Sequence, residues 1–263
     1  MNVRALIPAA GVGRRFGTTL PKQYQPLAGR PILERSIARL FDCRYIDQLV
    51  VALSPNDNDW PMIAEDVRDR VSVTTGGAER ADSVRLALQS MTDLAAGDWV
   101  LVHDAVRPLV SPLLIDKMLA SLRPEEPGAI LAVPIQDTVK RHIQSPDREP
   151  KIAETLDRSF LWAAQTPQVF QYGLLREALE KTQGDPAVTD EASAMEMCGH
   201  AVRLIEGDRQ NMKITSQQDL QLAELLWTQQ HAMSGSVGPS IVGSTIVGSS
   251  IVGPIEESND ANR

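Results

Sequence analysis

The sequence predicts an α/β fold in which helices cover both faces of a mostly parallel sheet. Short apolar runs rich in Val, Ile and Leu alternate along the chain with amphipathic stretches of helical period. Strands that are apolar along their whole length are typical of sheets buried on both faces. In such sheets ligands bind beyond the carboxyl ends of the strands, so a site is expected in the loops that follow them.

Each expected element rests on one of these two patterns. The expected strands are residues 3–8, 48–53, 71–75, 99–103 and 129–133. The expected helices are residues 31–41, 80–91, 112–122 and 216–229. Between about residues 135 and 164 the chain shows alternating residues and a turn-rich stretch, which together predict a β-hairpin extension.

The composition changes after about residue 231. Ile-Val-Gly recurs at residues 241–243, 246–248 and 251–253, with a period that matches neither a strand nor a helix. We therefore expect one domain over residues 1–230, with a β-arm at about 135–160. A low-complexity, disordered tail is expected over residues 231–263, and a β-forming tail is the alternative.

Composition and charge argue against several classes of protein. The net charge of −8 argues against non-specific binding of nucleic acid. No apolar run approaches the roughly 20 residues that cross a bilayer. The cysteines, Cys43 and Cys198, and the scattered histidines lack the spacing of a metal site. We expect a cytoplasmic protein with neither a nucleic-acid partner nor a membrane segment.

A loop of small residues leaves the first expected strand. It reads Pro8-Ala9-Ala10-Gly11-Val12-Gly13-Arg14-Arg15-Phe16-Gly17, and Lys22 follows it. Small side chains let backbone N–H groups approach a phosphate closely. The loop lacks the Gly-Lys-Ser/Thr of a Walker loop and the glycine spacing of a dinucleotide-binding loop. Taken alone, an ordinary turn with solvated charges remains the alternative.

Two further loops carry candidate ligand-binding residues. The segment Gly76-Gly77-Ala78-Glu79-Arg80-Ala81-Asp82-Ser83 leads from a strand into a helix and can contact a nucleotide, although a capped helix start explains it nearly as well. In His103-Asp104-Ala105-Val106-Arg107-Pro108, Asp104 ends an apolar strand, where a carboxylate can hold Mg²⁺ against a triphosphate. The alternatives for Asp104 are a cap of the next segment or a pair with Arg107.

Together the three loops resemble the 2-C-methyl-D-erythritol 4-phosphate cytidylyltransferase family, whose signature is similar to residues 103–108. The resemblance spans roughly residues 3 to 230, in the expected order, and leaves the tail outside. It continues through Asp137-Thr138, Asp157-Arg158, Gln165-Thr166-Pro167-Gln168, Thr189-Asp190-Glu191-Ala192-Ser193 and residues 207–215.

The resemblance implies a Rossmann-like nucleotidyltransferase fold and a defined reaction. Members transfer CMP from CTP to 2-C-methyl-D-erythritol 4-phosphate with Mg²⁺, giving 4-diphosphocytidyl-2-C-methyl-D-erythritol and pyrophosphate in the non-mevalonate isoprenoid precursor pathway. The family's arm packs into a partner subunit, which implies a homodimer. The alternatives are a ribitol-5-phosphate cytidylyltransferase, a sugar-1-phosphate nucleotidyltransferase with another base preference, and a nucleotide-binding scaffold without turnover.

The resemblance also implies roles for individual residues. The expected catalytic residues are Arg15, Lys22, Arg158 and Lys213, of which the last two also match positions that hold the acceptor. The expected substrate-binding residues are Ala9, Ala10, Gly11, Gly77, Ser83, Asp104, Ala105, Arg107, Thr138 and Thr166. Asp104 is the expected metal ligand. Some members carry an aspartate where this chain has Gln210, so a second carboxylate is expected only if Asp208 supplies it.

Overall fold

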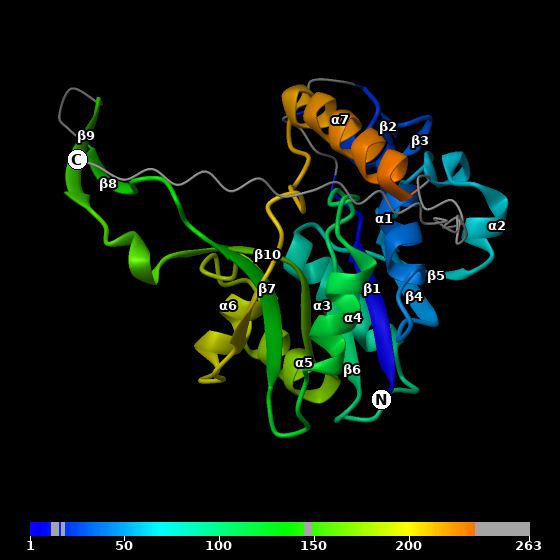
Figure 1. Ribbon diagram of the computed structural model, residues 1–263. Helices are drawn as coiled ribbons and strands as arrows, with labels where there is room; N and C mark the ends of the chain where they lie inside the picture. Colours follow the sequence, from blue (N-terminus) through cyan, green and yellow to red (C-terminus); the bar gives the residue numbers. More distant parts are fainter. Residues whose placement is uncertain (12–15, 17–18, 145–148, 235–263) are drawn as a thin grey trace, which may run out of the picture.

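A seven-stranded sheet forms the centre of the molecule in the computed structural model, which describes residues 1–11, 16, 19–144 and 149–234. The strand order is β11-β7-β10-β6-β1-β4-β5 (Figure 1). β10 runs antiparallel to its neighbours β6 and β7, and the other neighbours are parallel, which confirms a mostly parallel sheet. The strands are β1 (Val3–Pro8), β4 (Gln48–Leu53), β5 (Val71–Thr75), β6 (Trp99–Val102), β7 (Gly128–Pro134), β10 (Trp162–Gln171) and β11 (Arg203–Glu206).

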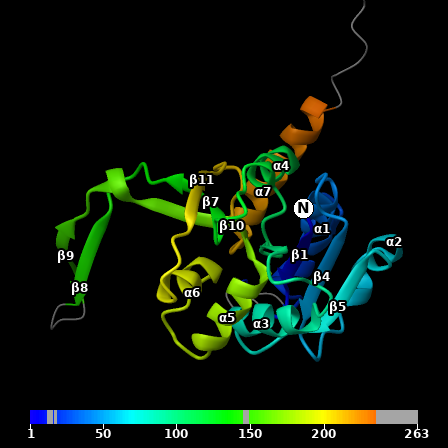
Figure 2. The same ribbon diagram turned by 90° about the horizontal axis from the view of Figure 1, so that it is seen from below.

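Helices cover both faces of this sheet, as expected (Figure 2). α1 (Ile32–Phe41) and α4 (Pro112–Ala120) lie on one face, and α3 (Arg80–Ser90), α5 (Tyr172–Lys181) and α6 (Glu191–Met197) lie on the other. Side chains alternate between the faces along each strand. In β1, Ala5 and Ile7 join the core under α1 and α4, whereas Leu6 joins the core under α3 and α5. Both faces are therefore closed to water around β1.

Smaller elements complete the body of the molecule. Two short strands, β2 (Pro26–Leu27) and β3 (Arg30–Pro31), form a separate pair beside the sheet. The remaining short elements are η2 (Lys22–Tyr24), η3 (Trp60–Met62), α2 (Glu65–Arg68) and η4 (Arg158–Phe160). The last helix, α7 (Gln217–Ser234), packs Leu220, Ala223 and Trp227 into a third apolar cluster that includes Leu27 and Ile32.

The expectation that every strand is buried on both faces is wrong for β5. Ser72, Val73 and Thr75 are exposed. β5 is the last strand of the sheet and pairs only with β4, so no further strand shields its outer edge. The apolar residues of this strand are valines, which suit any pleated, half-buried surface and do not by themselves indicate a central strand.

The β-hairpin extension is confirmed. β8 (Lys140–Gln144) pairs antiparallel with β9 (Pro150–Thr155), and both views show the pair standing away from the sheet (Figures 1 and 2). We call residues 135–160 the arm. Several apolar side chains on it face outward, among them Ile152 and Phe160, which are 67% and 83% exposed. Residues 145–148, which connect the two strands in the sequence, lie outside the described residues.

The tail was expected to begin at residue 231, but residues 231–234 belong to the last turn of α7. Residues 235–263 lie outside the described residues, so the expectation made for them remains a prediction. Among the helices that the structure describes, none combines the length and the apolar character that a bilayer span requires.

Candidate active site

Three loops meet at one edge of the sheet and line a cavity of about 140 Å³. They follow β1, β5 and β6, so these loops do share the edge at which the strands end, as the sequence predicts. This space, named the nucleotide cavity below, is lined by most of the expected site residues: Ala9, Ala10, Gly11, Lys22, Gly77, Ser83, Asp104, Ala105 and Lys213.

Size alone would have selected a different space, because a cavity of about 550 Å³ lies beside α4 and residues 206–209. A cavity of about 460 Å³ lies between the start of α3 and residues 182–189. It shares Glu79 and Arg80 with the nucleotide cavity, but none of the expected site residues that the structure describes lines it. We place the site in the smaller cavity because the glycine loops, the lysines and Asp104 converge there.

Lys22 reaches the nucleotide cavity because its short helix, η2, is fastened to the end of β1. Gln23 donates from Nε2 to the carbonyl oxygen of Ala9 at 3.0 Å, and Tyr24 donates from its hydroxyl to Asp57 at 2.9 Å. Both Gln23 and Tyr24 are buried. Lys22 directly precedes these two anchored residues, so its backbone is held in place rather than carried on an unsupported loop.

Gly76 and Gly77 allow the second loop to lie against the first. A Cβ on Gly76 would stand 2.6 Å from the Cβ of Ala10, and a Cβ on Gly77 would stand 2.4 Å from the Cβ of Asp82. Neither position has room for a side chain. The buried hydroxyl of Ser83 accepts from the backbone N–H of Gly77 at 3.0 Å, which holds this loop at the cavity wall.

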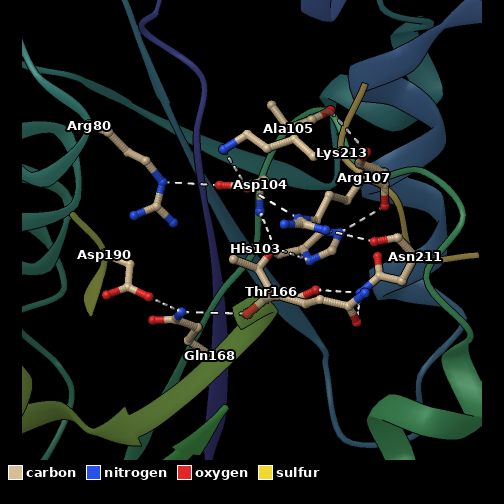
Figure 3. Close-up of polar contacts among 12 residues, drawn as sticks. Arg80, His103, Asp104, Ala105, Arg107, Thr166, Gln168, Asp190, Asn211 and Lys213 are labelled. Carbon is tan, nitrogen blue, oxygen red and sulfur yellow. Dashed lines mark hydrogen bonds and ion pairs between the residues drawn. The ribbon is translucent and has the colours of Figure 1, made fainter. Parts of the chain in front are cut away.

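Three cations surround the carboxylate of Asp104, the residue that follows the end of β6 by two positions (Figure 3). Arg80 donates from Nε to one oxygen at 3.0 Å. Lys213 and Arg107 reach the other oxygen, at 2.9 Å from Nζ and 3.3 Å from Nε. Burial alone would raise the pKa of Asp104, but Arg80, Lys213 and Arg107 outweigh it and hold the pKa well below its usual range. Asp104 is therefore a carboxylate at any pH near neutrality.

A second cavity, of about 190 Å³, lies on the other side of this cluster. It shares Arg80, Asp104 and Lys213 with the nucleotide cavity, and it adds Arg107 and Thr166 from the expected set. We call it the acceptor cavity. The two spaces are thus separated by one wall of charged side chains, at which two bound molecules could meet.

A buried hydrogen-bond network holds the backbone around Asp104 in place. His103 has its Nε2 at 3.1 Å from the carbonyl oxygen of Arg107, which can only accept, so Nε2 carries the proton and Nδ1 accepts from the hydroxyl of Thr166. Thr166 in turn accepts from the backbone N–H of Asp104 at 3.0 Å. Burial lowers the pKa of His103 to about 4, so the ring is neutral.

Thr166 therefore supports the site rather than opening into it with a free hydroxyl. Its carbonyl oxygen also accepts from Nδ2 of Asn211 at 2.8 Å, and the carbonyl oxygen of Asn211 accepts from Arg107 at 2.6 Å. The backbone N–H of Ile214 donates to Val106 at 2.9 Å and holds Lys213 beside Asp104.

Two charged residues that the sequence analysis did not assign to the site hold one another in this wall. Arg80 donates from both terminal nitrogens to the two oxygens of Glu191, at 2.7 and 3.0 Å. Glu191 is the first residue of α6 and is fully buried. The sequence offered a weak signal, since Glu191 stands in the Thr189-Asp190-Glu191 segment, but an acid there resembles an ordinary charge in the first turn of a helix.

The remaining expected residues do not gather at these cavities. Thr138 and Arg158 are exposed on the arm, and Arg158 donates to the backbone oxygen of Gln136. Neither lines the nucleotide cavity or the acceptor cavity among the described residues. Arg15 lies outside the described residues.

Asp208 and Gln210 face local partners instead of Asp104. Asp208 accepts from the backbone N–H of Gln210 at 2.8 Å, and Gln210 accepts from Nε2 of Gln230 on α7 at 3.0 Å. Within the described part of the chain, neither residue lines the nucleotide or the acceptor cavity.

The donor set fits only a metal ion that arrives with other ligands. In residues 1–11, 16, 19–144 and 149–234, no three His, Cys, Asp or Glu side chains gather as a metal cage. Asp104 is the carboxylate that both cavities share. Such a site suits Mg²⁺ held mainly by phosphate oxygens and water, because Mg²⁺ keeps several waters and takes few protein carboxylates.

The sheet, the glycine loops and the cationic edge define an α/β nucleotide-binding protein of the phosphate-transfer type. A family model described as IspD: 2-C-methyl-D-erythritol 4-phosphate cytidylyltransferase matches residues 3–229. The chain belongs to this family, and the resemblance inferred from its motifs is confirmed.

Known relatives agree with this assignment. The chain is 46% identical, over 85% of its length and 94% of the relative, to a 2-C-methyl-D-erythritol 4-phosphate cytidylyltransferase of Pseudomonas fluorescens strain SBW25. A crystal structure of a 4-diphosphocytidyl-2C-methyl-D-erythritol synthase superposes with a TM-score of 0.73 at 36% identity, over 86% of this chain and 99% of the other. The cytidylyltransferase of Francisella tularensis superposes with a TM-score of 0.70 at 34% identity, over 86% and 100%. The Rossmann-like nucleotidyltransferase fold is thereby confirmed.

Proposed function

We propose that this protein transfers the cytidylyl group of CTP to 2-C-methyl-D-erythritol 4-phosphate, in the supply of isoprenoid precursors. The observation that carries the proposal is the pair of cavities that share Asp104, Arg80 and Lys213 as one wall. A reaction between two phosphorylated molecules needs two adjoining anion sites, and membership of the family names the two substrates.

CTP occupies the nucleotide cavity in this proposal. Ala9, Ala10, Gly11 and Gly77 have small side chains or none, so the backbone here can lie close to the base, the ribose and the phosphates. Lys22 supplies a compact positive charge on a fixed support, and Lys213 supplies a second one at the dividing wall. Arg15 joins them by its match to the family.

The reaction requires no covalent enzyme intermediate. An oxygen of the acceptor phosphate forms a bond to the α-phosphorus of CTP while the bond to the β-phosphate breaks, and pyrophosphate leaves with that electron pair. A phosphate is already ionised near neutral pH, so no general base is needed. The barrier is mainly electrostatic, because two anions approach and charge accumulates on the bridging oxygen. When bound, Mg²⁺ supplies further positive charge at the phosphates, with Asp104 as its protein carboxylate.

The acceptor site is completed by a second copy of the chain in this proposal, so the protein acts as a homodimer. Thr138 and Arg158 belong to the arm, which stands away from the sheet of its own chain (Figure 1), and neither lines a cavity described above. Phe160, beside Arg158, is 83% exposed, as is usual for an apolar side chain that an interface covers. The arm of each subunit would bring these residues to the acceptor cavity of the other.

The protein works in the cytoplasm in this proposal, where CTP is made. The thiols of Cys43 and Cys198 are both free, which supports a reducing compartment.

The decisive experiment measures pyrophosphate release from CTP with each candidate acceptor. We expect release with 2-C-methyl-D-erythritol 4-phosphate and little release when ribitol 5-phosphate, or another nucleoside triphosphate, replaces one substrate. Preference for ribitol 5-phosphate would favour the other cytidylyltransferase, and a change of base would favour a sugar-phosphate nucleotidyltransferase. Binding of CTP without release under any of these conditions would indicate a scaffold.

A further inference from the structure

We propose that Glu191 is a positioning residue that acts through Arg80 on the carboxylate shared by the two cavities. The inference rests on the proposed function and assigns a task to a buried acid that the reaction scheme does not use. Glu191 lines neither the nucleotide cavity nor the acceptor cavity as described, so it has no direct contact with a ligand there.

One guanidinium joins two buried carboxylates in this arrangement. The terminal nitrogens of Arg80 grip both oxygens of Glu191, and the remaining nitrogen, Nε, points at Asp104. A two-point grip fixes the plane of the guanidinium as well as its position. The direction of Nε toward Asp104 is therefore set by Glu191.

The hydrogen bonds to Glu191 also limit the N–H donors that Arg80 has left for a phosphate. Arg80 belongs to the wall of both cavities, yet its two fork nitrogens already serve Glu191. Lys213 is also bonded to Asp104, but its side chain is 37% exposed and its ammonium is flexible. Arg80 is therefore held in one orientation by Glu191. Lys213 is the cation of this wall that can move toward a ligand.

The start of α6 has other anchors besides this pair. Asp190 caps the helix by accepting from the backbone N–H of Ser193 at 2.9 Å, and the hydroxyl of Ser193 accepts in return from the N–H of Asp190. The N–H of Ala192 donates to Gln168 at 3.0 Å. The start of α6 is thus anchored without the Glu191 carboxylate.

Burying an acid completely is costly unless a partner balances it. Burial raises the pKa of Glu191 and the charge of Arg80 opposes that rise. A leucine or methionine at the same position would fill the space at less electrostatic cost. The arrangement is understandable if the charge of Glu191 is needed to aim Arg80.

The experiment compares three variants with the intact protein. Glu191→Gln keeps the size of the side chain but removes its charge and places an amide N–H against the guanidinium. We expect kcat to fall about 10-fold or more, since small errors in the placement of reacting groups cost that much, while KM for CTP does not rise. Arg80→Gln should lower kcat as well, and the double variant should be no worse than Arg80→Gln alone, because Glu191 then has nothing to aim.

Glu34 provides a matched control. It is also a buried glutamate paired with an arginine, Arg30 at 2.6 Å, and it accepts from the N–H of Ala64 far from the cavities. Glu34→Gln should lower Tm but leave kcat and both KM values unchanged. Glu191→Asp, which keeps the charge, should recover part of the lost kcat. If Glu191→Gln does not fold, Glu191→Asp takes its place in every comparison, with Glu34→Asp as its control.

Two results would overturn the proposal. One is a Glu191→Gln variant that loses stability like Glu34→Gln but keeps its kcat. The other is a double variant whose losses multiply, which would show that Glu191 acts independently of Arg80. The Tm, measured by scanning calorimetry on the same set, applies the double-variant comparison without turnover, because the loss in the double variant should be smaller than the sum of the two single losses. Absence of turnover in the intact protein would refute the proposed function, whereas the calorimetric comparison would still judge Glu191.

Discussion

At Asp104, one carboxylate serves as the meeting point of side chains from three distant parts of the chain. Arg80, Arg107 and Lys213 carry three positive charges, and Asp104 and Glu191 carry two negative ones, so this cluster of five side chains keeps one net positive charge. An acidic protein of net charge −8 thereby keeps a cationic site for anionic ligands. In a site with little water, such positioned charge has a larger effect than it would at the surface.

Lys22 should affect turnover far more than binding. Lys22 lies on η2 and lines the nucleotide cavity, where the proposed reaction accumulates charge. We expect Lys22→Ala to lower kcat about 100-fold or more, the effect typical of losing one transition-state contact, with a much smaller change in the Kd for CTP. Steady-state kinetics and calorimetry measure the two quantities.

Lys181 is the control for this change. It is an exposed lysine on α5, paired with Glu177 at 2.5 Å, and Lys181→Ala removes the same group without touching the cavity. Its kinetics should match those of the intact protein. A Lys22→Ala variant that behaves like Lys181→Ala would remove Lys22 from the catalytic set.

Replacing Asp104 should change the dependence on magnesium. Asp104 is the carboxylate common to both cavities, so Asp104→Asn should raise the Mg²⁺ concentration that gives half-maximal rate. Gln210 is bonded to Gln230 on α7, and Gln210→Asp should therefore leave this concentration unchanged. Titration of the rate with Mg²⁺ tests both. An unaltered curve for Asp104→Asn would exclude Asp104 as a metal ligand.

His103 should make stability depend on pH below neutrality. Burial lowers its pKa to about 4, below the 6.5 of a free histidine, so the unfolded chain takes up a proton first as the pH falls. The stabilisation by the neutral ring is present above pH 6.5 and is lost between pH 6.5 and 4. From pH 7 to pH 5 the free energy of unfolding should fall by about 2 kcal/mol from this group.

Urea unfolding at the two pH values measures this effect. The same comparison in His103→Gln, which cannot titrate, should show a smaller difference between pH 7 and pH 5. Equal pH dependence in the two proteins would mean that His103 is not the group responsible.

Among the elements, the arm is the one that holds the acceptor in the proposed function. Arg158 belongs to η4 on the arm and matches a contact to the acceptor phosphate. Arg158→Ala should raise KM for the acceptor at least 10-fold, the effect of losing a charge-assisted bond, and leave KM for CTP nearly unchanged. Equal weakening of both substrates would contradict this division.

A mixing experiment tests from which subunit Arg158 acts. Subunits with Arg158→Ala and subunits with Lys22→Ala are each impaired, but a mixed dimer assembles one site with both native residues. Partial recovery of activity on mixing is the expected result. If the activity of the mixture is only the average of the two variants' activities, Arg158 and Lys22 of the same chain act in one site.

The sequence predicted the elements whose signal is local. The apolar runs of β1, β4, β6 and β7 lie within one or two residues of their predicted ends, because a buried strand needs apolar side chains on both faces. β10 was not predicted. Its centre carries Gln165, Thr166 and Gln168, which are buried through hydrogen bonds to partners far away in the chain.

The residues of the candidate site also fall into those that a local sequence signal predicts and those that only long-range contacts reveal. Gly77 and Asp104 were predicted because strand ends in a parallel sheet converge, which is a property of the fold class. The pair of Arg80 and Glu191 spans 111 residues, and a sequence shows neither the distance between two such charges nor the depth at which they lie.

For the whole molecule, the tail is the part whose removal should matter least. The family match ends at residue 229, and Trp227 is the last residue of the apolar cluster under α7. Deleting residues 235–263 should leave Tm and kcat unchanged. Thermal unfolding and the pyrophosphate assay measure this, and a clear drop in either quantity would show that the tail contributes to the folded protein.

The place of β10 between β6 and β7 also determines the order in which the sheet can be assembled during synthesis. β6, β1, β4 and β5 form a parallel group that is complete once residue 102 has been made, but β6 keeps one open edge until β10 arrives at residues 162–171. The ribosome needs several seconds for these roughly 70 residues at ~5–20 residues per second. During that time the nascent chain presents an unpaired strand edge, the template on which other chains aggregate. We expect the nascent chain to be most prone to aggregation just before residue 171 leaves the ribosome.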